Sequence, residues 1–463
     1  MTASTLPTSL PTTRMVASWI AGLRHEHVPQ TVRAALRRLV LDTLGDALFG
    51  RDQPWTEAVR NWAVMAAPAA GTRQARLWGE PGVRMLRPAD AALVNGTAAH
   101  AYELDDYHNA KLHPGAVVIP AAFALGEALD ADGAKLETAI AAGYEVMIRS
   151  ALALGPGPAR LRGWHLTAVC GPMGAAAASA VLLGLDEERT AWSLGLAGTQ
   201  SGGLFAFTSD GTASKRFHPG RAAQSGIMAA ELAALGLSGP TKIYEAVDGG
   251  LLSTFVDKAD AAQLTDGLGS TWHGADTSFK PYSCCGSLHP NVDAALELRP
   301  NWRKGGRVRV GLAKVVDVQC GYDYEAGSEL NSQMSARYCV AAALLDGAVL
   351  PAQFAPERIA DAEITQLARA IELVHDPELD QLYPEHFAGW VECENAQGKL
   401  ERTWLKDPSG SPLNPMMQDS LQRKYHTLVT PILGEAKTKR LADTVADLGR
   451  HSTRDVLQQL VAT

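Results

Sequence analysis

The chain has 463 residues, with 42 basic and 50 acidic side chains and a formal net charge of −8, and its length suggests two or three domains or one large core. Six cysteines without a Cys-x-x-Cys pair argue against a disulfide framework and against a zinc ribbon or finger, and they indicate a reducing compartment. Lys and Arg are scattered along the chain, so we expect neither nucleic acid nor an anionic membrane as a partner.

The stretch from Met1 to Arg14 is rich in Thr, Ser and Pro and has no apolar segment, so we predict that it is not a secretory signal. Two uncharged stretches, Leu166–Leu185 and Ala191–Ser209, are long enough to span a bilayer. Because Ala, Gly, Ser and Thr dominate both, we expect buried helices of a large core instead. The protein is therefore predicted to be cytoplasmic.

The first part of the chain, to about residue 270, reads as one helix after another. In Val32–Leu48 apolar residues recur at spacings of three and four, which is typical of one face of a helix, and Gly50 supplies a stop. Small residues let helix axes approach closely, so we predict a tightly packed helical domain. Four further segments show the same pattern: Ala91–Ala101, Val117–Leu129, Ala168–Leu183 and Arg221–Leu237.

The pattern changes near Phe279. Apolar and polar residues alternate in Val308–Gln319, which predicts a strand, and Trp390–Trp404 reads as a hairpin with a turn through Asn395–Gly398. Helical runs are expected at Ser335–Leu345 and Ile359–His375. A smaller α+β unit is therefore predicted in this part of the chain.

The last stretch, Asp419–Val461, reads as helical again and is expected to rejoin the first helices. We therefore predict a mainly α fold with a discontinuous, all-helical domain built from both chain ends, residues 1–275 and 406–463. A smaller α+β lid domain is expected over residues 276–405.

The densest cluster of ionisable residues lies between positions 100 and 113, between two predicted helices. Such a group can shift pKa values enough for acid–base chemistry near neutral pH, although a solvated helix end is an equally simple interpretation. A metal site is a weaker alternative, because the spacing fits no standard zinc signature, so we expect no metal. The cluster comprises His100, Glu103, Asp105, Asp106, His108 and His113, with Lys111 among them.

Three further residues stand out near predicted helix starts. His165 begins an uncharged helix, where the positive end of the dipole favours nearby anions, although an isolated His is often a core residue. Lys215 and His218 lie in a basic segment, Ser214–Arg221, placed just before the next helix, where cations oppose the dipole. This segment is either an anion site that suits a carboxylate ligand or a solvated basic turn.

Cys284 and Cys285 are adjacent, and His289 follows four residues later. The simplest interpretation is a pair of buried thiols in a turn. The chain has no G-x-S-x-G motif, no P-loop and no G-x-G-x-x-G after a strand. The sequence therefore argues against a triad hydrolase, an NTPase and a dinucleotide-dependent enzyme. We expect chemistry without a cofactor.

At these segments the sequence resembles the MmgE/PrpD family, whose members include 2-methylcitrate dehydratase, cis-aconitate decarboxylase and iminodisuccinate epimerase. The resemblance runs over nearly the whole chain. Five segments carry it in order: Asn95–His100 continuing to His113-Pro114, Gly163–His165, Ser214–Gly226, Lys280–Pro290 and Tyr338–Gly347.

The resemblance implies a homodimer with a pocket between a helical domain and a lid, which holds a small di- or tricarboxylate without metal or organic cofactor. It implies His113 as base or acid, Lys215 and His165 as groups that bind a carboxylate and stabilise charge, and Tyr338 as a proton donor or hydrogen-bonding group. The residues expected to bind substrate are Glu103, Tyr107, His218, Cys285 and His289.

Three positions depart from the family pattern. Glu103 stands where Asp is usual, Tyr107 where Thr or Ser is common, and Cys285 where the decarboxylases carry His. The first expectation is therefore a hydro-lyase, and decarboxylation comes second. An epimerase or isomerase of a dicarboxylate and a non-catalytic carboxylate-binding protein remain as alternatives.

Overall fold

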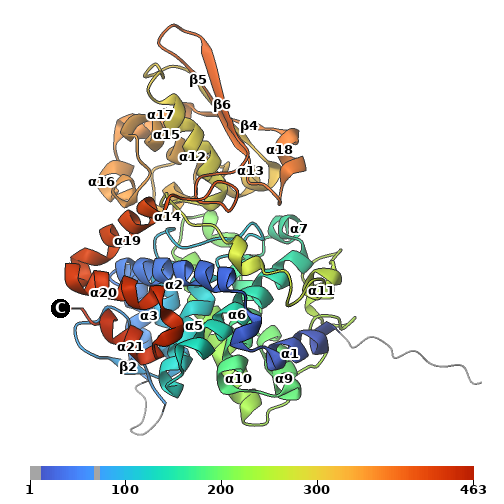
Figure 1. Ribbon diagram of the computed structural model, residues 1–463. Coiled ribbons are helices and arrows are strands. Elements are labelled where there is room, and N and C mark those ends of the chain that lie inside the picture. Colours follow the sequence, from blue (N-terminus) through green and yellow to red (C-terminus); the bar gives the residue numbers. More distant parts are fainter. Residues whose placement is uncertain (1–11, 67–72, 463) are drawn as a thin grey trace, which may run out of the picture.

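The computed structural model describes residues 12–66 and 73–462, and the fold over these residues is mainly helical (Figure 1). Most of the stretch from Met1 to Arg14, where the sequence predicts no secretory signal, lies outside the described residues. The described part contains one large group of helices and one smaller group of helices on a sheet, drawn at the bottom and the top of Figure 1.

The larger group contains eleven helices from the first part of the described chain and a two-stranded sheet, and the last three helices return to it. The helices are α1 (Thr12–Gly22), α2 (Gln30–Gly50), α3 (Pro54–Val64), α4 (Pro88–Ala99), α5 (Gly115–Leu129), α6 (Gly133–Leu154), α7 (Pro156–Leu161), α8 (Leu166–Leu183), α9 (Glu187–Gly198), α10 (Ser214–Ala234) and α11 (Leu251–Thr254), then α19 (Gln418–Leu433), α20 (Glu435–Ala446) and α21 (Thr453–Leu457), with strands β1 (Ala75–Arg76) and β2 (Met85–Leu86).

The smaller group is built on a four-stranded sheet of order β4-β3-β5-β6, in which only the β3–β4 pair is parallel. The strands are β3 (Val308–Leu312), β4 (Glu372–His375), β5 (Gly389–Glu394) and β6 (Leu400–Leu405). The helices of this group are α12 (His289–Leu298), α13 (Lys314–Cys320), α14 (Glu329–Gln333), α15 (Ala336–Asp346), α16 (Pro356–Ile359), α17 (Ala362–Ala370) and α18 (Pro377–Leu382).

Buried apolar side chains form two clusters. The larger cluster draws on residues 16–279 and 421–460, and the smaller one on residues 284–393. Phe205 and Phe207 are exceptions, because they come from the loop after α9 and yet belong to the smaller cluster. The domain boundaries at 275/276 and 405/406 stay a prediction.

Small residues set the spacing of the central helices, as the sequence indicated. Gly220 of α10 packs against α4 so closely that a Cβ atom there would lie 2.1 Å from the carbonyl oxygen of Leu93. Helix α8 is apolar and long enough to cross a membrane, but 89% of it is buried inside the molecule. Its apolar surface therefore faces other helices, as in a core helix.

The helix over Val32–Leu48, its stop at Gly50 and the hairpin at Trp390–Trp404 are confirmed. Two expected boundaries in the smaller group are wrong. The expected strand Val308–Gln319 ends at Leu312, and Val315 and Val316 are both buried in α13, because adjacent buried residues suit a helix rather than an alternating strand. In place of the expected helix Ile359–His375, α16 ends at Ile359, α17 covers Ala362–Ala370, and the chain continues into strand β4.

The uncharged stretch Ala191–Ser209 is not one helix, since α9 ends at Gly198. Helix α10 begins at Ser214 and not at Arg221, which places Lys215, Arg216 and His218 inside the helix. The cations oppose the helix dipole, and the compensation comes from a buried carboxylate, Glu103.

Candidate active site

A pocket lies where the two clusters of buried side chains meet. The loop between α4 and α5, residues 100–114, supplies one wall, α7 and the start of α8 supply a second, and Lys215 of α10 a third. Residues 285–287, Gln319 and Phe387 close it from the smaller group. The open space at its centre is about 40 Å³, enough for a few water molecules.

The structure brings six of the predicted site residues into the wall of this pocket. His218 and His289 lie behind the wall and contact lining residues, namely His165 and Tyr107. Tyr338 lies elsewhere, in the smaller buried cluster, where its hydroxyl donates to the carbonyl oxygen of Gln353. The six lining residues are Glu103, Tyr107, His113, His165, Lys215 and Cys285.

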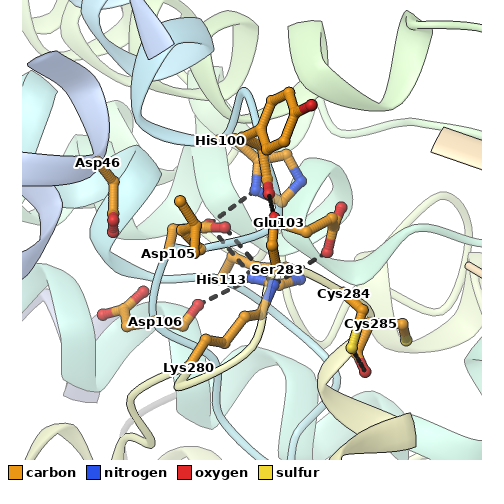
Figure 2. A network of polar contacts seen from close by, with 12 residues as sticks. Asp46, His100, Glu103, Asp105, Asp106, His113, Lys280, Ser283, Cys284 and Cys285 are labelled. Carbon is orange, nitrogen blue, oxygen red and sulfur yellow. Dashed lines mark hydrogen bonds and ion pairs between the residues drawn. The ribbon is translucent and has the colours of Figure 1, made fainter. Parts of the chain in front are cut away.

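His113 is held in one tautomer. Its Nδ1 lies 2.8 Å from the backbone oxygen of Asp106, and a carbonyl oxygen only accepts, so Nδ1 carries the proton in the neutral ring. The other ring nitrogen, Nε2, is then the basic atom. The backbone N–H of His113 donates to Oγ1 of Thr167, which anchors the residue from α8. Figure 2 shows this arrangement beside Asp105 and His100.

Lys215 is fixed by two residues of the α4–α5 loop. It donates to Glu103 and, over 2.7 Å, to Nε2 of His100. Nε2 can accept because Nδ1 of His100 donates to Asp105 over 2.7 Å. Burial lowers the pKa of His100 to about 3, so this ring stays neutral at ordinary pH. The chain Asp105–His100–Lys215 therefore sets the position of the ammonium group at the pocket.

Glu103 is the centre of a buried ion network, of which Figure 2 shows Glu103 and Lys280. Its carboxylate contacts Lys215, Arg216 at 2.8 Å and Lys280 at 2.9 Å. Burial alone would raise the pKa of Glu103, but the three cations hold it well below its ordinary value. Its backbone has a φ of 57°, in the left-handed region that non-glycine residues rarely adopt, and the ion network holds it there. The solvated-terminus interpretation of this cluster is wrong, because Glu103, Asp105 and Asp106 are buried.

His165 precedes the first residue of α8, as the sequence predicted. Its Nδ1 lies 2.9 Å from Nδ1 of His218, so one ring donates to the other. Burial lowers the pKa of both rings, that of His218 to about 4, and each is neutral at ordinary pH. The ring of His165 also packs edge-on against Phe205 and Phe207.

Cys284 is a buried thiol, whereas Cys285 lines the pocket. Nε2 of Gln319 donates to the Cys285 sulfur over 3.1 Å. A hydrogen bond from Cys320, aided by the charge of Lys111, lowers the pKa of the Cys285 thiol to about 5 against the effect of burial. The charge of Lys111 thus favours the ionised form of the Cys285 thiol.

Several site residues escaped the sequence analysis. Lys280 and Lys111 lie in segments that carry the family resemblance, but no role was predicted for either. The Lys-Pro-Tyr motif could have pointed to Lys280. Arg160, in the short helix α7, gave none. Lys111 and Arg160 both line the pocket.

His100, Asp105 and His113 each offer a possible metal-ligand atom, and these atoms lie within 4.8 Å of one another. Most of them are already in hydrogen bonds: Asp105 accepts from His100, Nε2 of His100 accepts from Lys215, and Nδ1 of His113 donates to Asp106. A cation placed among them would also meet the Lys215 ammonium. We therefore interpret the three residues as a hydrogen-bonded positioning group.

Comparison with known proteins covers nearly the whole chain. Residues 14–263 match the model of the MmgE/PrpD N-terminal domain, and residues 282–449 match that of the MmgE/PrpD C-terminal domain. A cis-aconitate decarboxylase of Aspergillus terreus is 31% identical over 463 residues, which cover 95% of this chain and 93% of that protein. The cis-aconitate decarboxylases of Mus musculus and Homo sapiens are 26% and 27% identical, with coverage of 97% and 94% of this chain and 93% and 91% of theirs.

Proposed function

The chain belongs to the MmgE/PrpD family, and on that basis we propose that it is a lyase that acts on a small aconitate-like polycarboxylate by acid–base catalysis. The names of its relatives support this class of reaction and substrate. The carboxylate groups of such a substrate match a pocket whose wall, in the described part of the chain, carries Lys111, Arg160 and Lys215 but only one carboxylate, Glu103.

One observation carries the proposal: a histidine with a fixed tautomer shares a buried pocket with a fixed ammonium group. Nδ1 of His113 is committed to the Asp106 carbonyl, so Nε2 is left to take or give a proton. Lys215 keeps one N–H beyond its bonds to Glu103 and His100, and we assign that N–H to a substrate carboxylate.

The chemistry needs both groups. When a proton is removed from the carbon beside a carboxylate, negative charge grows on that carboxylate, and a nearby cation stabilises it. In a dehydration, Nε2 of His113 takes the proton from carbon, the carbon–oxygen bond breaks, and the hydroxyl group takes that same proton from the His113 imidazolium and leaves as water. His165 and Lys215 hold the carboxylate during this step.

A decarboxylation uses the same groups in another order. The carbon–carbon bond to one carboxylate breaks, CO2 leaves, and the electron pair stays on the remaining carbon skeleton. His113 then delivers the proton to carbon from its charged form. The relatives' names favour decarboxylation, whereas Cys285, at a position where the family resemblance implies His in decarboxylases, favours dehydration.

Proton NMR of the protein with cis-aconitate, citrate and 2-methylcitrate, each in a separate sample, tests the proposal. We expect conversion of at least one acid, and release of CO2 identifies a decarboxylase, whereas a new alkene from a hydroxy acid identifies a dehydratase. Conversion should be absent in His113→Ala and present in a control, His375→Ala, because His375 lies at the end of strand β4 with Asp380 as its partner.

The same samples in D2O separate the alternatives. Deuterium in recovered, inverted substrate without any new product contradicts the lyase and supports an epimerase. Stabilisation by these acids without conversion of any of them contradicts catalysis and supports a carboxylate-binding protein. A homodimer and a cytoplasmic location are parts of the same proposal, and size-exclusion chromatography with light scattering checks the first.

A further inference from the structure

Lys111 is a partly buried lysine whose ammonium group has no carboxylate partner among the described residues. Its Nζ donates to two neutral acceptors, Oγ of Ser287 at 2.9 Å and Oε1 of Gln319 at 3.0 Å. The same Nζ lies 5.3 Å from the ring centroids of Tyr383 and Phe387. Because a buried charge is costly unless an anion compensates it, this arrangement needs a negative group in the pocket.

Arg160 is the second such cation. Its side chain is about 6% exposed, and its guanidinium carbon lies 3.5 Å from the centroid of the Phe205 ring. Its Nε is buried and has no hydrogen-bond partner in the part of the chain that the structure describes. An aromatic face offsets part of the charge but accepts no strong hydrogen bond, so the planar fork of N–H donors is left for a ligand.

The two cations both line the pocket near Cys285 and Cys320, which we call the Lys111 end, and their charges repel each other. The charge of Arg160 is one of the groups that lower the pKa of Lys111, after burial. Cys285 and Cys320 also face Lys111 and raise that pKa. Even with Cys285 ionised, one thiolate faces two cations, so a net positive charge remains at this end.

The Lys215 end of the pocket differs in this respect. Lys215 shares the Glu103 carboxylate with Arg216 and Lys280, whereas Lys111 and Arg160 share no hydrogen-bond partner with them among residues 12–66 and 73–462. The pocket therefore has two separate groups of cations, one neutralised in part by the protein and one not. A ligand that satisfies both carries negative charge at two separated points.

From this arrangement we propose that Lys111 and Arg160 form a second carboxylate subsite, which binds the carboxylate that a tricarboxylate has and a dicarboxylate lacks. This inference rests on the proposed function and names a specificity determinant for it. Ser287 and Gln319 orient the ammonium group of Lys111, and the Phe205 ring orients the guanidinium of Arg160. The subsite selects substrates by charge and takes no part in the proton transfer at His113.

Equilibrium binding tests the subsite without turnover. Titration calorimetry compares tricarballylate with glutarate, which has the same carbon chain without the central carboxylate. Wild-type protein should bind tricarballylate more tightly by roughly 10- to 100-fold, the range for a hydrogen-bonded charged group. In Lys111→Met and in Arg160→Gln this preference should fall below about threefold.

Two controls match the variants. Arg162→Gln removes an exposed arginine two residues from Arg160, whose partner is Asp257, and Lys314→Met removes an exposed lysine at the start of α13. Both should keep the wild-type preference. Lys111→Arg and Arg160→Lys keep the positive charge and should keep most of the preference for tricarballylate. These variants separate loss of charge from a folding defect. Thermal melts of every variant show whether it is folded.

The subsite is refuted if wild-type protein shows no preference for tricarballylate, or if the preference survives in both Lys111→Met and Arg160→Gln, whether or not both acids bind more weakly. The outcome is independent of the lyase proposal. If the preference for tricarballylate depends on Lys111 but the protein converts none of the acids, the subsite is supported and the lyase is contradicted. If the protein converts an acid but the preference is the same in wild-type protein and in both variants, the lyase is supported and the subsite is contradicted.

Discussion

Nζ of Lys215 lies 2.7 Å from Nε2 of His100, and the ammonium group donates to the ring. This direction is forced, because Nδ1 of His100 donates to the Asp105 carboxylate. A neutral histidine thus holds the lysine in place without cancelling its charge. The positive charge is left to act on a ligand in the pocket.

His113→Ala should reduce turnover by at least about 100-fold, because it removes the group assigned to proton transfer. The fold should survive, since the ring contributes one hydrogen bond to the Asp106 carbonyl and one contact of 3.3 Å to Asp105. Steady-state kinetics with a converted acid, together with circular dichroism, measure both effects. Wild-type rates in this variant would remove His113 from the mechanism.

Glu103→Gln should destabilise the protein by about 3–5 kcal/mol, because it leaves three buried cations without their shared carboxylate. Urea unfolding followed by fluorescence measures the change in free energy. Glu372→Gln is the matched control, since the Glu372 carboxylate is exposed and its ion pairs with Arg307 and Arg309 should contribute little to stability. Similar losses in the two variants would contradict the central role of Glu103.

The alkaline side of the pH profile should depend on Lys111. Burial lowers the pKa of its ammonium group to about 8, so the group is charged below that pH and neutral above it. With a tricarboxylate substrate, kcat/KM should therefore fall by roughly 10-fold or more as the pH rises above 8, because this ratio reports ionisations of the free enzyme.

Lys111→Arg should shift this fall to higher pH, because a guanidinium keeps its proton. The Cys285 thiol, with a pKa of about 5, titrates well below this range and does not produce the same limb. The measurement is kcat/KM of wild-type protein and Lys111→Arg from pH 6 to 10. If kcat/KM falls at the same pH in both proteins, the fall is due to a group other than Lys111.

Gly220→Ala should cost about 2–3 kcal/mol of stability, because the new Cβ would lie 2.1 Å from the Leu93 carbonyl oxygen and force α10 away from α4. Since α10 carries Lys215, activity should fall as well. Gly22→Ala is the control: no atom of the described residues lies within 4 Å of its Cβ position, and alanine favours a helix. Thermal melts compare the two, and equal melting temperatures would show that α4 and α10 can adjust.

The sequence predicted the helices best where small and apolar residues recur with a helical period, as in α2, α5 and α8. It failed at the start of α10, because basic residues in the first turn are unfavourable unless something distant in the chain compensates them. That partner, Glu103, lies more than one hundred residues away, and no local pattern reveals the pairing.

The same limit applies to the site. The family resemblance led to six side chains that the structure places in one pocket, and local chemistry alone named the cluster between residues 100 and 113. Arg160 could not be found this way, since its position beside Phe205 depends on how a loop from the larger group enters the smaller cluster. Tyr338 shows the converse, because a matching motif did not place its side chain in the pocket wall.

Phe205 and Phe207 bridge the two clusters of buried side chains, and the space beside them holds only a few water molecules. Swinging the smaller group away would expose both rings to solvent, at about 1.5–3 kcal/mol for each. An open form of that kind would make up on the order of one molecule in a hundred or fewer. If ligands exchange with solvent through such an opening, both aromatic rings have to unpack each time, and we expect product release to limit turnover.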